Sequence, residues 1–253
     1  AEKILATQYN RPGHEIISHY TYVFAGDGCL MEGISAEASS LAGHLGLGKI
    51  IMLYDDNSIT IDGGTDLAFS ENVQQRYESF GWQVIEVDGH DRQAIRLAIK
   101  EAQACTQKPS LLCCKTIIGK GSPNKAGKSS AHGAALGETE VGLVRKKLKW
   151  NHKPFEIPKV ILNEWREIGE KGTLHEKKWS VVYNKKSKKI KSEIARILND
   201  KLPKNFEKII YEQKKKFFNL KTEVASRQSS AYVLEGISNS LPELIGGSAD
   251  LSG

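Results

Sequence analysis

The chain has little of what a membrane protein or a disulfide-rich protein needs. No run approaches the ~18 consecutive apolar residues of a membrane-spanning helix, and the mean hydropathy is -0.39. Ala1 is followed by neither a basic region nor an apolar leader, so we expect no secretory precursor. The 253 residues include only four cysteines, without a CxxC pair or metal-ligand spacing, which excludes a disulfide scaffold. We expect Cys113 and Cys114, adjacent in an apolar run, to be small buried residues in a reducing compartment.

Positive charge is concentrated in the second part of the chain. Residues 1–150 carry 16 Lys and Arg against 17 Asp and Glu, whereas residues 151–253 carry 20 against 13. Such asymmetry is typical of a nucleic-acid-binding arm. However, the basic run 177–191 overlies an apolar stripe, mostly at helical spacing: Trp179, Tyr183, Ile190, Ile194 and Ile197. We therefore favour the solvated face of an amphipathic helix, and we expect neither a nucleic acid nor a membrane as partner.

Strand-like and helix-like segments alternate in the first part of the chain. Apolar runs predict strands at 20–25, 49–54, 82–87 and 110–114, with helices at about 30–45 and after Asp91. This order predicts parallel βαβ units, and a loop rich in Gly, Ser and Lys follows at 119–137. Helices are expected at about 159–169, 174–199 and 204–220, and another begins near Ser226. We predict an α/β domain at 1–157, a helical linker at 158–222 and the start of a second α/β domain at 223–253.

One motif in the α/β part carries chemistry. Gly26-Asp27-Gly28 follows the first predicted strand, and Asp55-Asp56-Asn57 follows the second, so both lie at the carboxyl edge where ligands bind. The oxygens of Asp27 and Asn57, with a backbone carbonyl just beyond, suit Mg²⁺. Gly28 lets a phosphate approach the backbone at a helix N-terminus. A lone Gly-Asp-Gly is more often a tight turn, but the complete 32-residue pattern predicts a cradle for a metal and a diphosphate.

The 32-residue pattern resembles the thiamin diphosphate signature, and several further blocks resemble the transketolase family. These blocks are 26–35, 115–119, 121–127, His132-Gly133-Ala134, 154–158 and 242–251. The resemblance covers nearly the whole chain and is weakest between about 159 and 222. It implies a thiamin diphosphate-binding fold, a parallel sheet flanked by helices. Residues 1–157 would be a diphosphate-binding (PP) domain without its N-terminal part, and 223–253 the start of a pyrimidine-binding (Pyr) domain. The chain would then be an internal portion of a transketolase.

The resemblance also implies roles for individual residues. Asp27, Asn57 and the carbonyl of Ile59 match the metal ligands, and Gly28, Asn57, His132 and Asp250 match cofactor contacts. His132 also matches a catalytic histidine that binds the donor ketose, and Arg227 an arginine that binds the sugar phosphate. Glu32 and Glu37 match carboxylates at a subunit interface. Two positions depart from the family pattern: Ser129, where many members have a second histidine, and Ala135, where many have proline.

The activity that the resemblance implies is transfer of a two-carbon ketol unit between sugar phosphates. Thiamin diphosphate and Mg²⁺ would be the cofactors, with Ca²⁺ or Mn²⁺ as substitutes. A cytoplasmic homodimer with its active site at the subunit interface, acting in the pentose phosphate pathway, is expected. The alternatives are a sister enzyme of the dihydroxyacetone synthase or deoxyxylulose-phosphate synthase type, and a non-catalytic binding protein. Residues 1–253 expressed alone are expected to be inactive, because the family's cofactor-activating glutamate lies beyond them.

Overall fold

The computed structural model describes residues 1–221 and 223–247 and divides the chain into two compact units. The first unit comprises Ala1–Asn10 and Ile17–Thr173, and the second comprises Arg11–Ile16 and Leu174–Gly253. The strands, all in the first unit, are β1 (Thr21–Gly26), β2 (Ile50–Asp56), β3 (Gln83–Asp88) and β4 (Ser110–Lys115). The helices of the first unit are α1 (Glu2–Tyr9), α2 (Asp27–Met31), α3 (Gly33–His44), α4 (Val73–Ser79), α5 (Arg92–Ala104) and α6 (Glu138–Lys147). Two short 3-10 helices lie at Thr65–Leu67 and Ser129–Ala131. α7 (Lys159–Asn184) includes residues of both units, and α8 (Lys188–Leu198), α9 (Phe206–Leu220) and α10 (Ser226–Ser238) belong to the second.

The sheet of the first unit confirms the predicted parallel α/β fold. Its order is β1-β2-β4-β3, and every neighbouring pair is parallel. Gly26 pairs with Asp55, and Asp56 pairs with Lys115. The two predicted motif ends therefore lie at one carboxyl edge of the sheet, as the sequence indicates.

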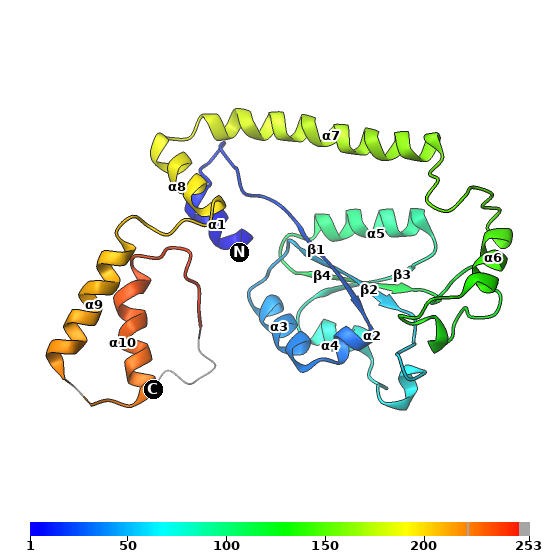
Figure 1. Ribbon diagram of the computed structural model, residues 1–253, viewed down its shortest axis with the longest axis horizontal. Helices are drawn as coiled ribbons and strands as arrows, with labels where there is room; N and C mark the ends of the chain where they lie inside the picture. The colour runs from blue at the N-terminus through cyan, green and yellow to red at the C-terminus, as the bar shows by residue number, and fades with distance from the viewer. Residues whose placement is uncertain (222, 248–253) are drawn as a thin grey trace. The chain divides into compact units, whose positions relative to one another are not determined.

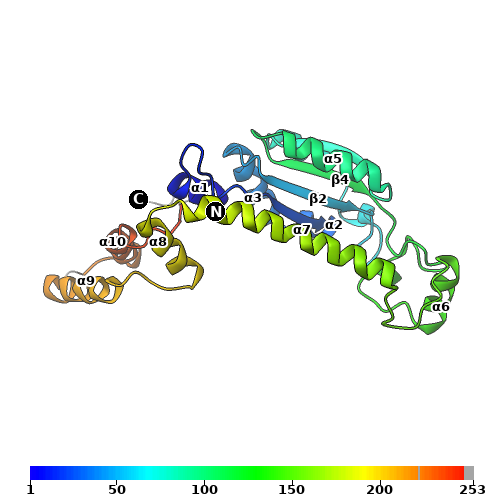
Figure 2. The same cartoon turned by 90° about the horizontal axis from the view of Figure 1, so that it is seen from above.

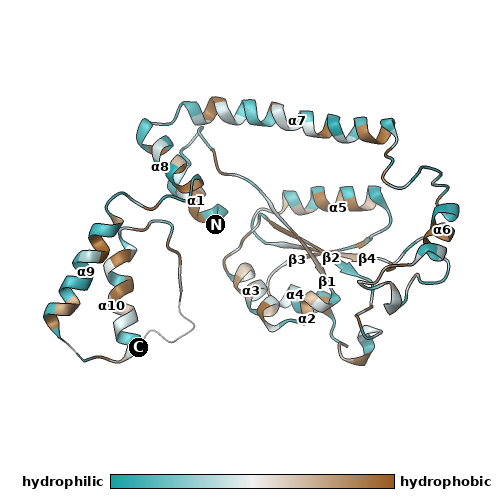
Figure 3. Ribbon diagram, in the orientation of Figure 1, coloured by the Kyte–Doolittle hydropathy of each residue, from teal (hydrophilic) through white to brown (hydrophobic). Residues whose placement is uncertain are grey.

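Helices cover both faces of this sheet, with α5 on one face and α2, α3 and α4 on the other (Figures 1 and 2). Buried residues on the α5 side include Ile51, Leu112 and Cys114, while Leu111, Tyr54 and Cys113 pack on the opposite side. Alternate residues of a strand point to opposite faces, so a sheet covered on both sides needs continuous apolar strands. The hydrophobic colouring of the strands in Figure 3 follows this rule. Cys113 and Cys114 are buried free thiols, which confirms the burial expected for them.

Three predicted helices have different bounds in the structure. The helix predicted at 30–45 is divided into α2 and α3, because Glu32 has an extended ψ of 132°. The break predicted near residues 170–173 is absent, since α7 runs unbroken through Gly169 and Gly172. The interruption comes instead before α8, where the Ser187 side chain accepts a hydrogen bond from the Ile190 N–H as an N-cap.

The second unit contains the basic run of the sequence. Ile194 of the apolar stripe is buried as predicted, whereas Trp179 stacks on Tyr183 at 4.7 Å but remains 40% exposed. Most lysines of the run are exposed. Lys186 is an exception, because it is buried and its Nζ donates to the carbonyl of His14 at 2.5 Å. Across the described ranges, no helix is both long enough and apolar enough to cross a membrane.

Candidate functional site

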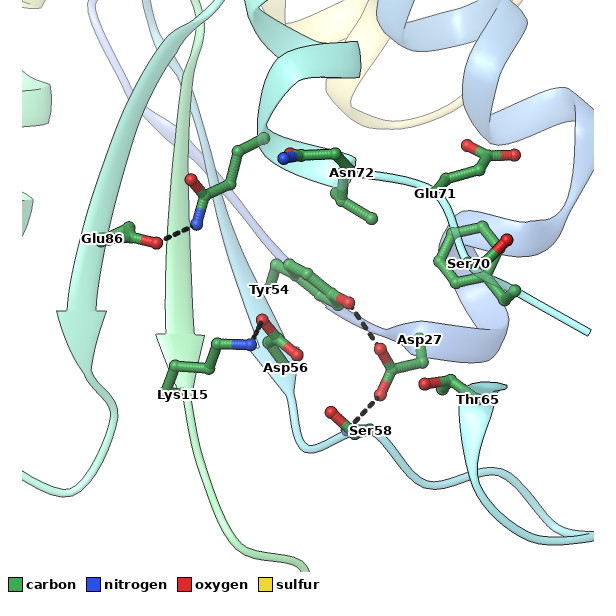
Figure 4. Close-up of a pocket in the computed structure, with 13 residues that line it drawn as sticks. Asp27, Tyr54, Asp56, Ser58, Thr65, Ser70, Glu71, Asn72, Glu86 and Lys115 are labelled. Carbon is green, nitrogen blue, oxygen red and sulfur yellow. Dashed lines mark hydrogen bonds and ion pairs between the residues drawn. The ribbon is translucent and has the colours of Figure 1, made fainter. Parts of the chain in front are cut away.

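The candidate site begins at Asp27, the first residue of α2. The carboxylate follows directly from β1 and is only 4% exposed. Oδ1 accepts a hydrogen bond from the Tyr54 hydroxyl at 2.5 Å, and Oδ2 accepts one from the Ser58 N–H at 3.1 Å (Figure 4). Burial, together with the hydrogen bond to Asp27, raises the pKa of Tyr54. Tyr54 therefore stays protonated and acts as the donor in this hydrogen bond.

The loop after β2 brings the predicted ligands to the same place. The Asn57 side chain accepts a hydrogen bond from the Ile59 N–H at 3.0 Å and donates one to Asp55 at 3.2 Å. Ser58 has a positive φ of 61°, an uncommon conformation for a residue other than glycine. Ser58, in this bend, donates its N–H to Asp27. Asp27 and the segment 57–59 thus form one hydrogen-bonded group, although they are about 30 residues apart in the sequence.

Two cavities adjoin this group. One of about 490 Å³ is lined by polar and charged residues, among them Asp27, Ser58, Asp56 and Lys115. The last two form an ion pair of 2.5 Å across the ends of β2 and β4 (Figure 4). A second cavity, of about 540 Å³, is lined by residues that include Gly28, Thr60 and His132. Thr65 lines both cavities, so they lie next to each other at the carboxyl edge.

The second cavity unites two predicted contacts of the cofactor, Gly28 and His132. A Cβ built on Gly28 would meet no atom within 4 Å, so the packing of this chain does not demand glycine there. A close ligand would give the reason for its presence. Nδ1 of His132 is buried and has no hydrogen-bond partner among the described residues. A buried polar atom of this kind calls for a partner from outside the chain.

The donor chemistry fits a small hard cation beside a diphosphate. Asp27 supplies a carboxylate, Asn57 an amide oxygen and Ile59 a backbone carbonyl, all of them hard oxygen ligands. Within the part of the chain that the structure describes, His, Cys, Asp and Glu form no cluster of three or more able to hold a metal. One carboxylate with neutral oxygens leaves coordination positions for phosphate and water, as Mg²⁺ prefers.

The remaining predicted site residues differ in their position in the fold. Arg227 lies in the first turn of α10 in the second unit and is exposed. Glu32, between α2 and α3, is exposed and lines the cavity of Gly28 and His132. Glu37 is exposed on α3. Asp250 lies outside the described residues.

Sequence analysis missed two residues that shape the site. The sequence predicts Tyr54 to be an ordinary core residue of β2. Its hydroxyl lies near the carboxyl edge because Tyr54 comes one residue before Asp55, close to the end of the strand. Glu140 is 7% exposed and accepts hydrogen bonds from Ser122 and Asn124, in the loop that carries His132. No sequence signal marks Glu140, because its partners lie 16 and 18 residues earlier in an irregular loop.

Comparison with known proteins gives consistent matches along the chain. Residues 1–203 match the family described as transketolase, thiamine diphosphate binding domain. Transketolase 2 of Escherichia coli (strain K12) is 50% identical over 256 residues, covering all of this chain and 38% of that protein. Transketolase 1 of Pasteurella multocida (strain Pm70) is 51% identical over 259 residues, with the same coverage.

Solved structures give the same result. A Pichia stipitis transketolase structure described as a complex with xylulose-5-phosphate superimposes with a TM-score of 0.87 at 39% identity. It covers 99% of this chain, which in turn covers 37% of that protein. Transketolase from Leishmania mexicana gives a TM-score of 0.85 at 36% identity, again over 99% of this chain. The chain spans little more than a third of the length of these relatives.

Proposed function

Because the chain belongs to the transketolase family, through its thiamine diphosphate-binding domain, we propose that its protein is a transketolase. It would transfer a two-carbon ketol unit from a ketose phosphate to an aldose phosphate, using thiamin diphosphate and Mg²⁺. The observation that carries the proposal is the convergence of Asp27 and the segment 57–59 beside the cavity of Gly28 and His132. These are the residues that the resemblance assigns to the metal, the diphosphate and the substrate.

The site residues would have distinct roles in binding the cofactors and the substrate. Asp27, Asn57 and the carbonyl of Ile59 would hold the metal ion, with Ca²⁺ or Mn²⁺ as substitutes, and Gly28 would let the diphosphate approach the backbone. Bound thiamin diphosphate would supply the ring that stabilises the two-carbon carbanion. His132 would hydrogen-bond the donor hydroxyls and move a proton at its imidazole. Arg227 would bind the substrate phosphate through its planar guanidinium, and Asp250 would contact the cofactor.

The resemblance also supports proposals about the setting of the enzyme. We propose a cytoplasmic homodimer with the active site at the subunit interface, acting in the pentose phosphate pathway. Neither a nucleic acid nor a membrane is proposed as partner. The domain boundaries at 157/158 and 222/223 stay predictions.

Calorimetric titration with thiamin diphosphate at fixed Mg²⁺ tests the metal and diphosphate site. Asp27→Asn keeps the size of the side chain but removes the charge, and we expect it to abolish measurable binding. Asp66→Asn alters an exposed carboxylate that lines neither cavity, and it should bind as the wild type does. Unchanged affinity in folded Asp27→Asn would refute the metal assignment.

A ketol-transfer assay of the full-length protein that contains this chain, with xylulose 5-phosphate and ribose 5-phosphate, tests the activity itself. Turnover that requires both thiamin diphosphate and Mg²⁺ is expected. Cofactor binding without this turnover would favour a sister enzyme of the dihydroxyacetone synthase or deoxyxylulose-phosphate synthase type. Salt-dependent binding of nucleic acid without cofactor binding would favour the non-catalytic alternative.

A further inference from the structure

Glu140 is an acidic residue buried among the polar groups of a single loop. It lies in the first turn of α6 and is 7% exposed. Oε1 accepts hydrogen bonds from the Ser122 hydroxyl and from the Asn124 N–H at 2.8 Å, and Oε2 accepts one from Nδ2 of Asn124 at 2.8 Å. The hydrogen bonds from Ser122 and Asn124 lower the pKa of Glu140 to about 2. The ionised carboxylate therefore holds two positions near the start of the loop 119–137.

Further hydrogen bonds lead from these two positions to His132. The Ser122 hydroxyl also accepts from the Lys125 N–H at 3.1 Å, and Lys125 accepts from the Lys128 N–H at 3.2 Å. The Ala131 N–H donates to the carbonyl of Lys128 at 3.0 Å, and His132 follows directly. The conformation at Glu140 is thus connected to the backbone at His132 through consecutive turns.

A close packing contact joins Gly119, at the start of the loop, to Ala131, next to His132. A Cβ built on Gly119 would lie 3.0 Å from Cβ of Ala131, and Gly119 has a positive φ of 63°. The Gly127 N–H donates to the carbonyl of Ile118 at 2.8 Å, which closes this part of the loop. The segment before His132 therefore packs against residues 118–119, where the loop begins.

We propose that Glu140 is a positioning residue for His132. By holding Ser122 and Asn124, its carboxylate fixes the loop so that the imidazole faces the cavity that Gly28 also lines. The inference deepens the proposed function, because it assigns the orientation of a substrate-binding histidine to a residue that touches neither cofactor nor substrate. Glu140→Gln would keep the size of the side chain. However, the amide NH₂ can only donate, so it would face a donor of Asn124 or Ser122 where the carboxylate oxygen accepts a hydrogen bond.

Hydrogen exchange in the protein without added metal or cofactor measures the effect on the loop. Glu140→Gln should raise the exchange rates of amides 122–132 by roughly tenfold, since their opening reports local stability. Glu138→Gln changes an exposed carboxylate in the same helical turn and should leave these rates unchanged. Ser122→Ala removes one hydrogen-bond donor to Glu140 and keeps the charge of the carboxylate, so it should raise the exchange rates by less. This variant replaces Glu140→Gln in the test if Glu140→Gln does not fold. Unchanged exchange in both variants would overturn the proposal.

A double-mutant cycle with His132 separates positioning from general stability. Glu140→Gln should raise the KM for the ketose donor by roughly tenfold, within the range of coupling in one hydrogen-bonded network. In a His132→Ala background, the same change should raise KM by less than about twofold, because the group it positions is gone. Equal losses in both backgrounds would overturn the positioning role. A wild type without ketol transfer would refute the proposed function instead, and the exchange rates would still decide whether Glu140 orders the loop.

Discussion

The hydroxyl of Tyr54 on β2 donates a 2.5 Å hydrogen bond to Oδ1 of Asp27 at the start of α2. The second oxygen of the same carboxylate is held by the Ser58 N–H, from the loop that follows the same strand. β2 and its loop therefore determine the orientation of Asp27 before any ion binds. A ligand that is ordered in advance loses less conformational entropy when the ion arrives.

Tyr54→Phe tests how far the fold depends on this contact. The free energy of unfolding should fall by about 1.5–3 kcal/mol, because a buried carboxylate loses one of its donors. Urea denaturation measures the change. Tyr211→Phe is the matched control, since Tyr211 is 67% exposed and should lose little stability. Equal stability of Tyr54→Phe and the wild type would show that the contact contributes nothing.

Arg227→Ala tests the proposed phosphate contact. The KM for a phosphorylated ketose should rise about ten- to a hundredfold, which corresponds to the loss of about 1.5–3 kcal/mol from a charged hydrogen bond. The KM for an unphosphorylated donor such as hydroxypyruvate should change little. Arg166→Ala, at an exposed position on α7, is the control. The same loss with both donors would indicate a structural role for Arg227.

Acid should destabilise the protein through Glu140. Its pKa is about 2 in the folded protein against 4.5 for a free side chain, so below pH 4.5 the unfolded state binds more protons. The contribution to stability is complete above pH 4.5 and is lost as the pH falls toward 2. Glu140→Gln should therefore flatten the fall of unfolding free energy with pH in this window, as followed by urea denaturation. Glu138→Gln should keep the steeper wild-type dependence.

Alkali should destabilise the protein through Cys113. Burial, with a smaller effect of Asp56, raises the pKa of this thiol from 9.0 to about 12. Between these values the unfolded chain loses a proton that the folded protein keeps, so the contribution present below pH 9 is lost as the pH rises toward 12. Cys113→Ala should reduce the slope of unfolding free energy against pH in this range. Cys29→Ala, which removes an exposed thiol, should retain the wild-type slope.

Two helical glycines should respond in opposite ways to alanine. A Cβ on Gly43 of α3 would lie 1.8 Å from the carbonyl oxygen of Phe80, so Gly43→Ala forces α3 away from that backbone. Overpacking of this kind costs about 1–3 kcal/mol or more. A Cβ on Gly142 of α6 meets nothing within 4 Å, and Gly142→Ala should gain up to about 1 kcal/mol from helix propensity. Thermal unfolding should show a lower Tm for the first variant and a higher Tm for the second.

Local patterns in the sequence determined the layers of the first unit and the place of its motif. Continuous apolar runs predict strands covered on both faces, and the alternation with helices predicts that they are parallel. Parallel strands end at one edge, so Asp27 and Asn57 could be predicted to meet there without knowledge of any side-chain contact. The pattern also gave the burial of Cys113 and Cys114, because both lie inside a strand of this kind.

Only the tertiary structure decided which side chains hold the motif in place. Hydrophobic periodicity reports the face on which a residue lies, but it carries no information about the partner of a buried polar group. Tyr54 and Asp27 are 27 residues apart, and Glu140 reaches back 16 and 18 residues into a loop without periodicity. The break at Glu32 and the unbroken course of α7 likewise differ from the prediction. In α7 the propensity cost of a glycine, about 1 kcal/mol, is too small to end a helix by itself. Side-chain partners depend on distances between elements, and those distances exist only once the chain has folded.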